Sequence, residues 1–259
     1  MNVNETTKRG AGILLPVFSL PSNYGIGSFG DAAYQWIDFL SMSGQSYWQV
    51  LPLHPTSYGD SPYQSVSAFA GNPYFIDLDI LCKEGLLTPD ECSGVSFGDD
   101  PHQVDYHALY KGRDPLLRLA FARYVAHPEQ FSYQNDISKF RSDHASWLEP
   151  YALFMAIKKS QGGRSWIEWG DDLKFYDEKY LELIKHHLKD EIDYHIFVQY
   201  LFFKQWTDVK HYAHTKGIKI IGDIPLYVAL DSVDLWSRSD LFLLDKNKTP
   251  VAVAGCPPD

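Results

Sequence analysis

Residues 12–53 decide the fold class, and they read GILLPVFSLPSNYGIGSFGDAAYQWIDFLSMSGQSYWQVLPL. The stretch opens with Gly12–Val17, a continuous apolar run of the kind that buried parallel strands show. Apolar residues at helical spacing follow, with Asp31 as a suitable N-cap and Gly44 as a suitable stop. Tyr47–Leu53 then predicts a second strand. Strand, helix and strand at this spacing form a βαβ unit, which indicates an α/β protein.

A long helical segment separates the second predicted strand from a third. Apolar residues recur at helical spacing over much of residues 79–216, and Ile218–Ile224 (IKIIGDI) then has the pattern of another buried strand. A segment of roughly 140 residues is far longer than an ordinary crossover. We therefore expect an inserted helical subdomain.

Composition and charge exclude several classes of protein. A net charge of −10 argues against nucleic acid and anionic membranes as partners, since both need a basic face. No apolar run approaches the roughly 18 residues of a membrane helix, and the first ten residues lack the apolar core of a signal peptide. Three scattered cysteines, Cys82, Cys92 and Cys256, favour a reducing cytosol, so we expect a cytoplasmic protein.

The glycine spacing of GIGSFG, Gly25–Gly30, matches the dinucleotide fingerprint, but its context does not. That fingerprint needs its first glycine directly after the strand, whereas Phe18–Tyr24 intervene here. It also needs an acidic residue at the end of the second strand, where this chain has His54. We interpret GIGSFG as a loop built for tight turns.

A polar and aromatic loop, GDSPYQSVSAFAGNPY, spans Gly59–Tyr74. It follows the carboxyl end of the second strand, which is the active-site side of parallel α/β folds. Tyrosine can stack on a sugar ring and bond a hydroxyl, and carboxylates and amides can bond vicinal hydroxyls. From the residues alone, a binding loop and an ordinary surface loop are equally supported.

Asp223 ends the third predicted strand, after a run of apolar residues. A carboxylate there is costly unless it is partnered or functional, and in a barrel a strand-end acid is more often a site residue than a cap. Asp231 and Asp234 instead suit the next helix, which they would cap or orient. We expect no metal site, because His211 and His214 share a helix face without a third ligand.

Several blocks together resemble a known family, the 4-α-glucanotransferases (amylomaltase or disproportionating enzyme) of glycoside hydrolase family 77. The resemblance covers about residues 10–259, and the GDSPYQS–FAGNPY block is highly specific. The blocks are SLPSNYGIGSFGDAA, YWQVLPLHPTSYGDSPYQSVSAFAGNPYFIDL, YALFMAIK, FFKQW, IKIIGDIPLYVALDSVDLW and VAVAGCPPD.

The resemblance implies the N-terminal part of a (β/α)8 barrel with a large, mainly helical insertion between strands 2 and 3. We accordingly expect three parts. Residues 10–78 would be the first βαβ part with the substrate loop, residues 79–216 the inserted subdomain with barrel helices, and residues 217–259 the third strand and the start of a loop that covers the cleft.

The resemblance also implies an activity. Family members transfer α-1,4-glucan segments between maltodextrins, or to glucose, with the anomeric configuration retained. Retention requires two carboxyl groups about 5 Å apart, a nucleophile and an acid/base. The expected partners are therefore α-1,4-glucans, with glucose as an acceptor, and no cofactor.

Individual residues take expected roles from the family motifs. Tyr63 matches the tyrosine that packs on the sugar beside the scissile bond, and Asp223 matches an aspartate that contacts the donor-side sugar. Tyr58 matches a tyrosine that contacts glucan outside the central cleft. The other expected substrate contacts are Asp60, Ser61 and Asp259.

The resemblance places the nucleophile, the acid/base and a third carboxylate on strands four, five and seven, beyond residue 259. We expect this chain to be the N-terminal half of the transferase and inactive by itself. The alternatives are a non-catalytic glucan-binding module and a hydrolase of the same glucans.

Overall fold

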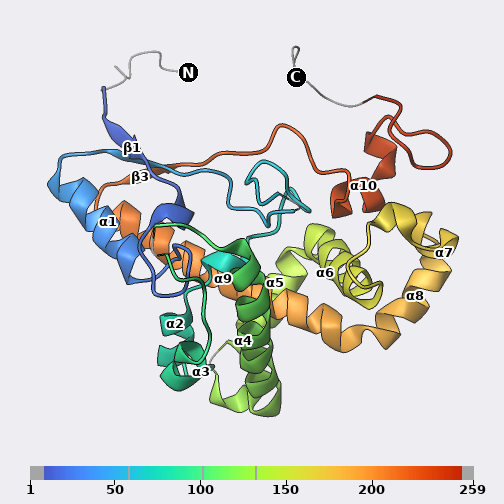
Figure 1. Ribbon diagram of the computed structural model, residues 1–259, viewed down its shortest axis with the longest axis horizontal. Helices are drawn as coiled ribbons and strands as arrows, with labels where there is room; N and C mark the ends of the chain where they lie inside the picture. The colour runs from blue at the N-terminus through green and yellow to red at the C-terminus, as the bar shows by residue number, and fades with distance from the viewer. Residues whose placement is uncertain (1–8, 58, 101, 132, 253–259) are drawn as a thin grey trace.

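A computed structural model describes residues 9–57, 59–100, 102–131 and 133–252. Its sheet has three parallel strands in the order β1 (Gly12–Leu14), β2 (Tyr47–Gln49) and β3 (Lys219–Ile221) (Figure 1). Gly12 pairs with Tyr47, and Tyr47 pairs with Lys219. The predicted strands are therefore present as parallel neighbours but are shorter than expected.

Helices make up most of the rest of the described chain. The α-helices are α1 (Asp31–Met42), α2 (Leu78–Lys83), α3 (Pro89–Ser93), α4 (Tyr106–Ala126), α5 (Gln134–Asp143), α6 (Ala145–Ser160), α7 (Asp171–Lys174), α8 (Glu178–His187), α9 (Lys189–Thr215) and α10 (Val233–Ser237). Short 3₁₀ turns are η1 (Val17–Ser19), η2 (Pro73–Phe75), η3 (Pro128–Gln130), η4 (Trp166–Glu168) and η5 (Ser239–Leu241).

The first helix begins one residue earlier than predicted. Gly30, and not Asp31, is the N-cap of α1, and Asp31 lies in its first turn. The carboxylate of Asp77 fills the space beside Gly30, because a Cβ there would lie 2.0 Å from Asp77 Oδ2. At the other end Gly44 has a φ of +69°, which suits a helix stop.

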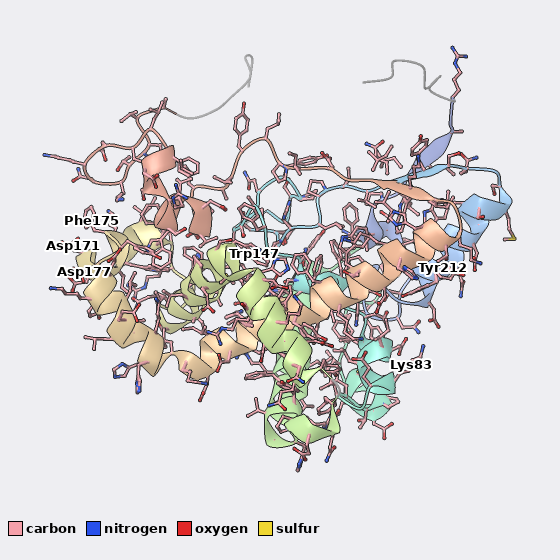
Figure 2. The ribbon with its side chains drawn as sticks, turned by 180° about the vertical axis from the view of Figure 1, so that it is seen from behind. Lys83, Trp147, Asp171, Phe175, Asp177 and Tyr212 are labelled. Atoms are coloured by element: carbon pink, nitrogen blue, oxygen red, sulfur yellow. The ribbon has the colours of Figure 1, made fainter. Side chains whose placement is uncertain are left out.

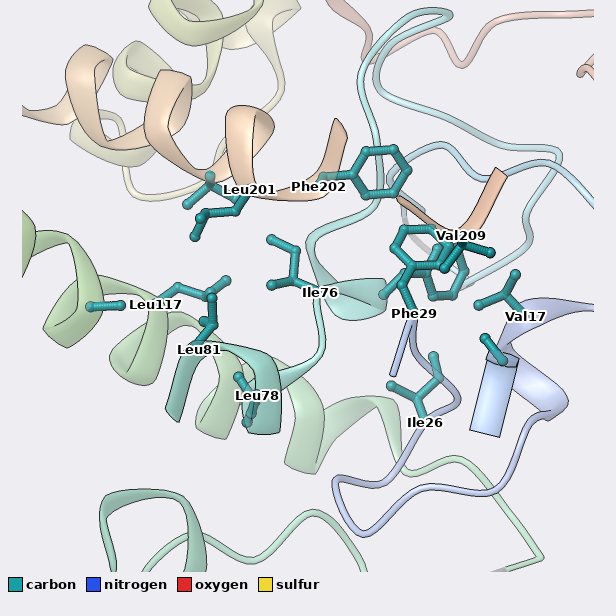
Figure 3. Close-up of a cluster of buried hydrophobic side chains, with 14 of the residues drawn as sticks. Val17, Ile26, Phe29, Ile76, Leu78, Leu81, Leu117, Leu201, Phe202 and Val209 are labelled. Atoms are coloured by element: carbon teal, nitrogen blue, oxygen red, sulfur yellow. The ribbon is translucent and has the colours of Figure 1, made fainter. Parts of the chain in front are cut away.

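Two hydrophobic clusters form the core. The first lies under the sheet, where Phe29 and Val17 meet Phe202 and Val209 of α9 (Figure 3). The second gathers around α6 and includes Ile192 and Ile196 of α9. The long helix α9, which carries Tyr212 near its C-terminal end (Figure 2), therefore contributes to both clusters. The division into parts at residues 78 and 216 stays a prediction.

The outer strands are less buried than their sequences predicted. Trp48 of the central strand β2 is fully buried, but Leu14 of β1 is 50% exposed and Ile221 of β3 is 43% exposed. β1 and β3 are the two edges of an open sheet, so part of their apolar surface has no neighbour within the described chain. The expected continuous burial is thus wrong for these two strands, and the described strands do not close a barrel.

Candidate functional site at the carboxyl edge of the sheet

The loop after β2 is a compact hairpin that projects Tyr63. Its arms meet at an antiparallel bridge between Thr56 and Ser65. Gly59 and Asp60 have φ values of 89° and 53°, a left-handed conformation that turns the chain sharply. As a result, the Tyr63 ring is 46% exposed at the tip.

Tyr63 and Asp223 meet across the ends of two neighbouring strands. The Tyr63 hydroxyl donates to Asp223 Oδ2 at 2.8 Å, and the backbone N–H of Ile224 donates to Oδ1 at 2.9 Å. The bond to this carboxylate raises the pKa of Tyr63. Because Asp223 follows β3 by two residues, the hydrogen bond joins the hairpin to the carboxyl edge of the sheet.

The segment after β3 runs beside the same hairpin. The backbone N–H groups of Ala229 and Val233 donate to the carbonyls of Ser65 and Val66 at 3.2 and 2.9 Å. Asp234 Oδ2 accepts from the N–H of Ala68 at 3.0 Å. These contacts fix the distance between the two loops that carry Tyr63 and Asp223.

Two buried glutamines of α9 hold the end of the loop and the start of α2. Gln199 accepts from the N–H of Gly71 at 2.7 Å and donates to its carbonyl at 2.9 Å. Gln205 makes the same pair of bonds to Asp77, at 2.7 and 3.2 Å. At Gly71 the backbone also comes so close to Phe202 that a Cβ would lie 2.1 Å from its ring.

These glutamines were not among the residues predicted to form the site. Their signal is visible in FVQYLFFKQW, where Gln199 and Gln205 interrupt a run of apolar and aromatic residues in a helix. A buried amide needs hydrogen-bond partners. A glutamine within an apolar helix therefore indicates that its side chain binds the backbone of a neighbouring segment.

The two aspartates expected to cap or orient the next helix do not cap it. Ser232 is the N-cap of α10, and its hydroxyl accepts from the N–H of Leu235 at 3.3 Å. Asp231 instead pairs with Lys158 of α6, and Asp234 contacts the hairpin loop. Both aspartates connect α10 to other segments, which a sequence pattern of capping residues cannot reveal.

Two partly buried titratable groups, His54 and Asp234, contact the loop. Burial lowers the pKa of His54, whose Nδ1 lies 3.2 Å from the carbonyl oxygen of Ala70. Burial also raises the pKa of Asp234, although His54 and the Ala68 amide oppose that shift. The two groups help to support the loop from below and do not lie at its exposed tip.

The other expected site residues divide into two sets. Asp60 and Ser61 lie in the same turn as Tyr63, and Ser61 Oγ accepts from the Tyr63 N–H at 3.3 Å. Burial raises the pKa of Asp60. Tyr58 and Asp259 lie outside the described residues.

Neither a metal cluster nor a membrane helix is found in the described ranges. No three His, Cys, Asp or Glu side chains in them converge as metal ligands would. Likewise, none of the helices described is both long and apolar enough to span a bilayer. What the site does offer is an exposed aromatic ring beside a hydrogen-bonded carboxylate, a combination that suits a polyhydroxylated ring.

Comparisons with known proteins show which chains this one resembles. The chain is 48% identical over 253 residues to a 4-alpha-glucanotransferase of Streptococcus pneumoniae serotype 4 (strain ATCC BAA-334 / TIGR4), covering 97% of this chain and 49% of the relative. It is 46% identical to the 4-alpha-glucanotransferase of Thermus thermophilus, covering 97% and 49%. An amylomaltase structure from Streptococcus agalactiae in complex with acarbose superposes with a TM-score of 0.92 at 43% identity, covering 97% and 50%.

The chain thus spans about half the length of the curated relatives it matches. A family model described as 4-alpha-glucanotransferase matches residues 15–259, nearly the whole chain. The resemblance noted from the sequence blocks is confirmed. This chain belongs to the 4-α-glucanotransferase family, glycoside hydrolase family 77.

Proposed function

We propose that the whole protein is a 4-α-glucanotransferase that transfers α-1,4-glucan segments between maltodextrins, or to glucose, with retention. Membership of the family and the acarbose complex of the Streptococcus agalactiae amylomaltase support this proposal. The observation that carries it for this chain is the 2.8 Å hydrogen bond between Tyr63 and Asp223. That bond holds side by side Tyr63 and Asp223, the two residues expected to contact the sugars at the scissile bond.

Tyr63 and Asp223 have separate tasks in the proposed site. The exposed ring of Tyr63 would stack on the sugar next to the scissile bond. The Asp223 carboxylate would accept hydrogen bonds from hydroxyls of the donor-side sugar and favour positive charge as it develops there. The Tyr63 hydroxyl orients that carboxylate, so the ring and the charge act at a fixed separation.

The proposed reaction exchanges one glycosidic bond for another. A carboxylate nucleophile attacks the anomeric carbon while a carboxylic acid protonates the leaving oxygen. The same acid, now ionised, then deprotonates the acceptor hydroxyl that displaces the enzyme. We assign these two groups to the half of the family fold that the described strands do not include. Acceptor sugars must outcompete water, which requires a site that excludes solvent.

Product analysis of the whole protein with maltotriose tests the proposal. We expect glucose together with a ladder of maltodextrins longer than maltotriose. Glucose and maltose without longer products would indicate a hydrolase, and binding of acarbose without turnover would indicate a glucan-binding module. Either result would overturn the transferase assignment.

A further inference from the structure

Two cysteines distant from the Tyr63–Asp223 site lie in contact. Cys82 is in the last turn of α2 and Cys92 is in α3, and their Sγ atoms are 3.7 Å apart. Figure 1 shows α2 and α3 side by side at the end of the molecule opposite α10 and below the sheet. The sequence analysis treated these cysteines as scattered, and the proposed function does not use them.

The first of the two helices is held firmly by the core. Leu78 and Leu81 of α2 are fully buried, and Figure 3 shows them beside Leu117 and Ile76. Asp77 caps the helix by accepting from the N–H of Ile80 at 3.0 Å. Cys82 therefore sits on a helix whose position is fixed by packing.

The second helix is held by polar contacts. Thr88 and Glu91 form a capping box at the start of α3. Arg123 of α4 binds Glu91 Oε1 at 2.7 Å, which anchors α3 to a long helix. The N–H groups of Leu86 and Leu87 donate to the carbonyl of Leu81 at 2.9 and 3.2 Å and close the turn between α2 and α3. Both helices are therefore fixed in place, α2 by packing and α3 by polar contacts, and this keeps the two sulfur atoms in contact.

We propose that Cys82 and Cys92 form the site of a reversible disulfide, produced by exchange with a low-molecular-weight disulfide. The thiolate of Cys82 attacks one sulfur of that disulfide and releases one small thiol. The thiolate of Cys92 then attacks the Cys82 sulfur and releases the second. Two protein thiols are oxidised and the small disulfide is reduced to two thiols, so electrons and atoms balance.

The difference in burial between Cys82 and Cys92 indicates which thiol reacts first. Cys92 is only 2% exposed, whereas Cys82 is partly exposed and can be reached by the small disulfide. Burial raises the pKa of both thiols, for Cys92 to about 12. The thiolate fractions at neutral pH are therefore small, and the bond forms slowly. Because a disulfide has an S–S length of about 2.05 Å, the sulfurs need only a short approach from contact.

The test uses glutathione disulfide as the probe. The protein carries Cys256→Ser, with serine at any other cysteine outside the pair, and is equilibrated with mixtures of oxidised and reduced glutathione. Free thiols are then trapped with N-ethylmaleimide and the denatured protein is digested with trypsin. Cleavage after Lys83 separates the two cysteines, so a linked pair of peptides identifies the bond directly.

We expect both thiols to disappear together and dithiothreitol to restore them. The rate should rise about tenfold between pH 7 and pH 8, since the thiolate fraction rises tenfold per unit below the pKa. The oxidised protein should unfold at a temperature at least about 2 °C above the reduced protein. Cys92→Ala should instead accumulate a glutathione adduct on Cys82, and Cys82→Ala should react much less.

Three results would overturn the proposal. These are a stable adduct on Cys82 while Cys92 keeps its thiol, disulfides only between separate protein molecules, and retention of both thiols in fully oxidised glutathione. Because the readout is the linked peptide and not glucan turnover, failure here is distinguishable from failure of the proposed transferase activity.

Discussion

The loop after β2 and the segment after β3 meet at the site, yet they are supported very differently. In the first, Ser65, Ala70 and Asn72 are buried and α9 holds the backbone. In the second, Leu226 is 87% exposed and Ile224 is 73% exposed. The backbone of the first loop is held by buried contacts, although Phe69 is 57% exposed, whereas the second leaves several apolar side chains uncovered within the described chain.

Apolar residues in the sequence do not by themselves produce burial. Each buried square ångström of apolar surface contributes roughly 25 cal/mol, but only where a second layer covers it. For the loop after β2, α9 is that layer. For Ile224, Leu226 and Tyr227 no such layer is present among the described residues, and these side chains stay exposed. The segment is held only further along, where Val228 packs against the second cluster and the Leu230 carbonyl accepts from Trp166 Nε1 at 2.8 Å.

Removing the α9 support should have the largest effect. Gln199→Leu leaves the buried N–H and carbonyl of Gly71 without partners, and each such group costs about 1–3 kcal/mol. We expect the free energy of unfolding to fall by about 2–4 kcal/mol in urea denaturation. Gln134→Leu, at an exposed position of α5, is the matched control. Equal effects of the two substitutions would contradict the role of Gln199.

The Asp223 carboxylate should matter for turnover and not for folding. Asp223→Asn keeps the shape and one of the two accepting oxygens but removes the charge. We expect kcat/KM of the whole protein for maltotriose to fall at least tenfold, or about 1.4 kcal/mol, with the melting temperature unchanged. Asp143→Asn, on the exposed end of α5, should leave turnover as it is. A loss of kcat/KM smaller than tenfold in Asp223→Asn would mean that the carboxylate serves only to hold the chain after β3 in place.

Two substitutions at Tyr63 separate the ring from its hydroxyl. Tyr63→Ala removes both and should lower kcat/KM about tenfold, while Tyr63→Phe removes only the bond to Asp223 and should cost about threefold. Neither should unfold the protein, because the side chain is 46% exposed. Steady-state kinetics with short maltodextrins provide the measurement. Unchanged turnover in Tyr63→Ala would eliminate the stacking role.

The smallest effect concerns Asp234, which connects α10 to the hairpin. Burial raises its pKa, so its contribution to stability is fully present below the ordinary value of about 3.9 and is lost as pH rises through the raised pKa. Asp234→Asn cannot ionise and keeps an acceptor for the Ala68 N–H. We therefore expect the difference in melting temperature, variant minus native protein, to be larger at pH 7 than at pH 4. The opposite trend would show that the charge stabilises the contact.

Local pattern was enough for much of the fold. Gly12–Val17 and Tyr47–Leu53 were predicted as strands from apolar runs, and the observed β1 and β2 lie inside them. Helical spacing also predicted helices over much of residues 79–216, where the structure places the long helix Lys189–Thr215. Such signals are carried by neighbouring residues, so no knowledge of distant contacts is needed.

Order and spacing along the chain were sufficient to predict the βαβ unit, the long helical segment and the family resemblance. Only the tertiary structure decided which distant groups meet: Tyr63 with Asp223, Gln199 with Gly71, and Cys82 with Cys92. It also placed the Asp77 carboxylate against the helix cap Gly30, where no Cβ would fit. Hydrogen bonds and close packing depend on positions in space, and no local periodicity specifies them.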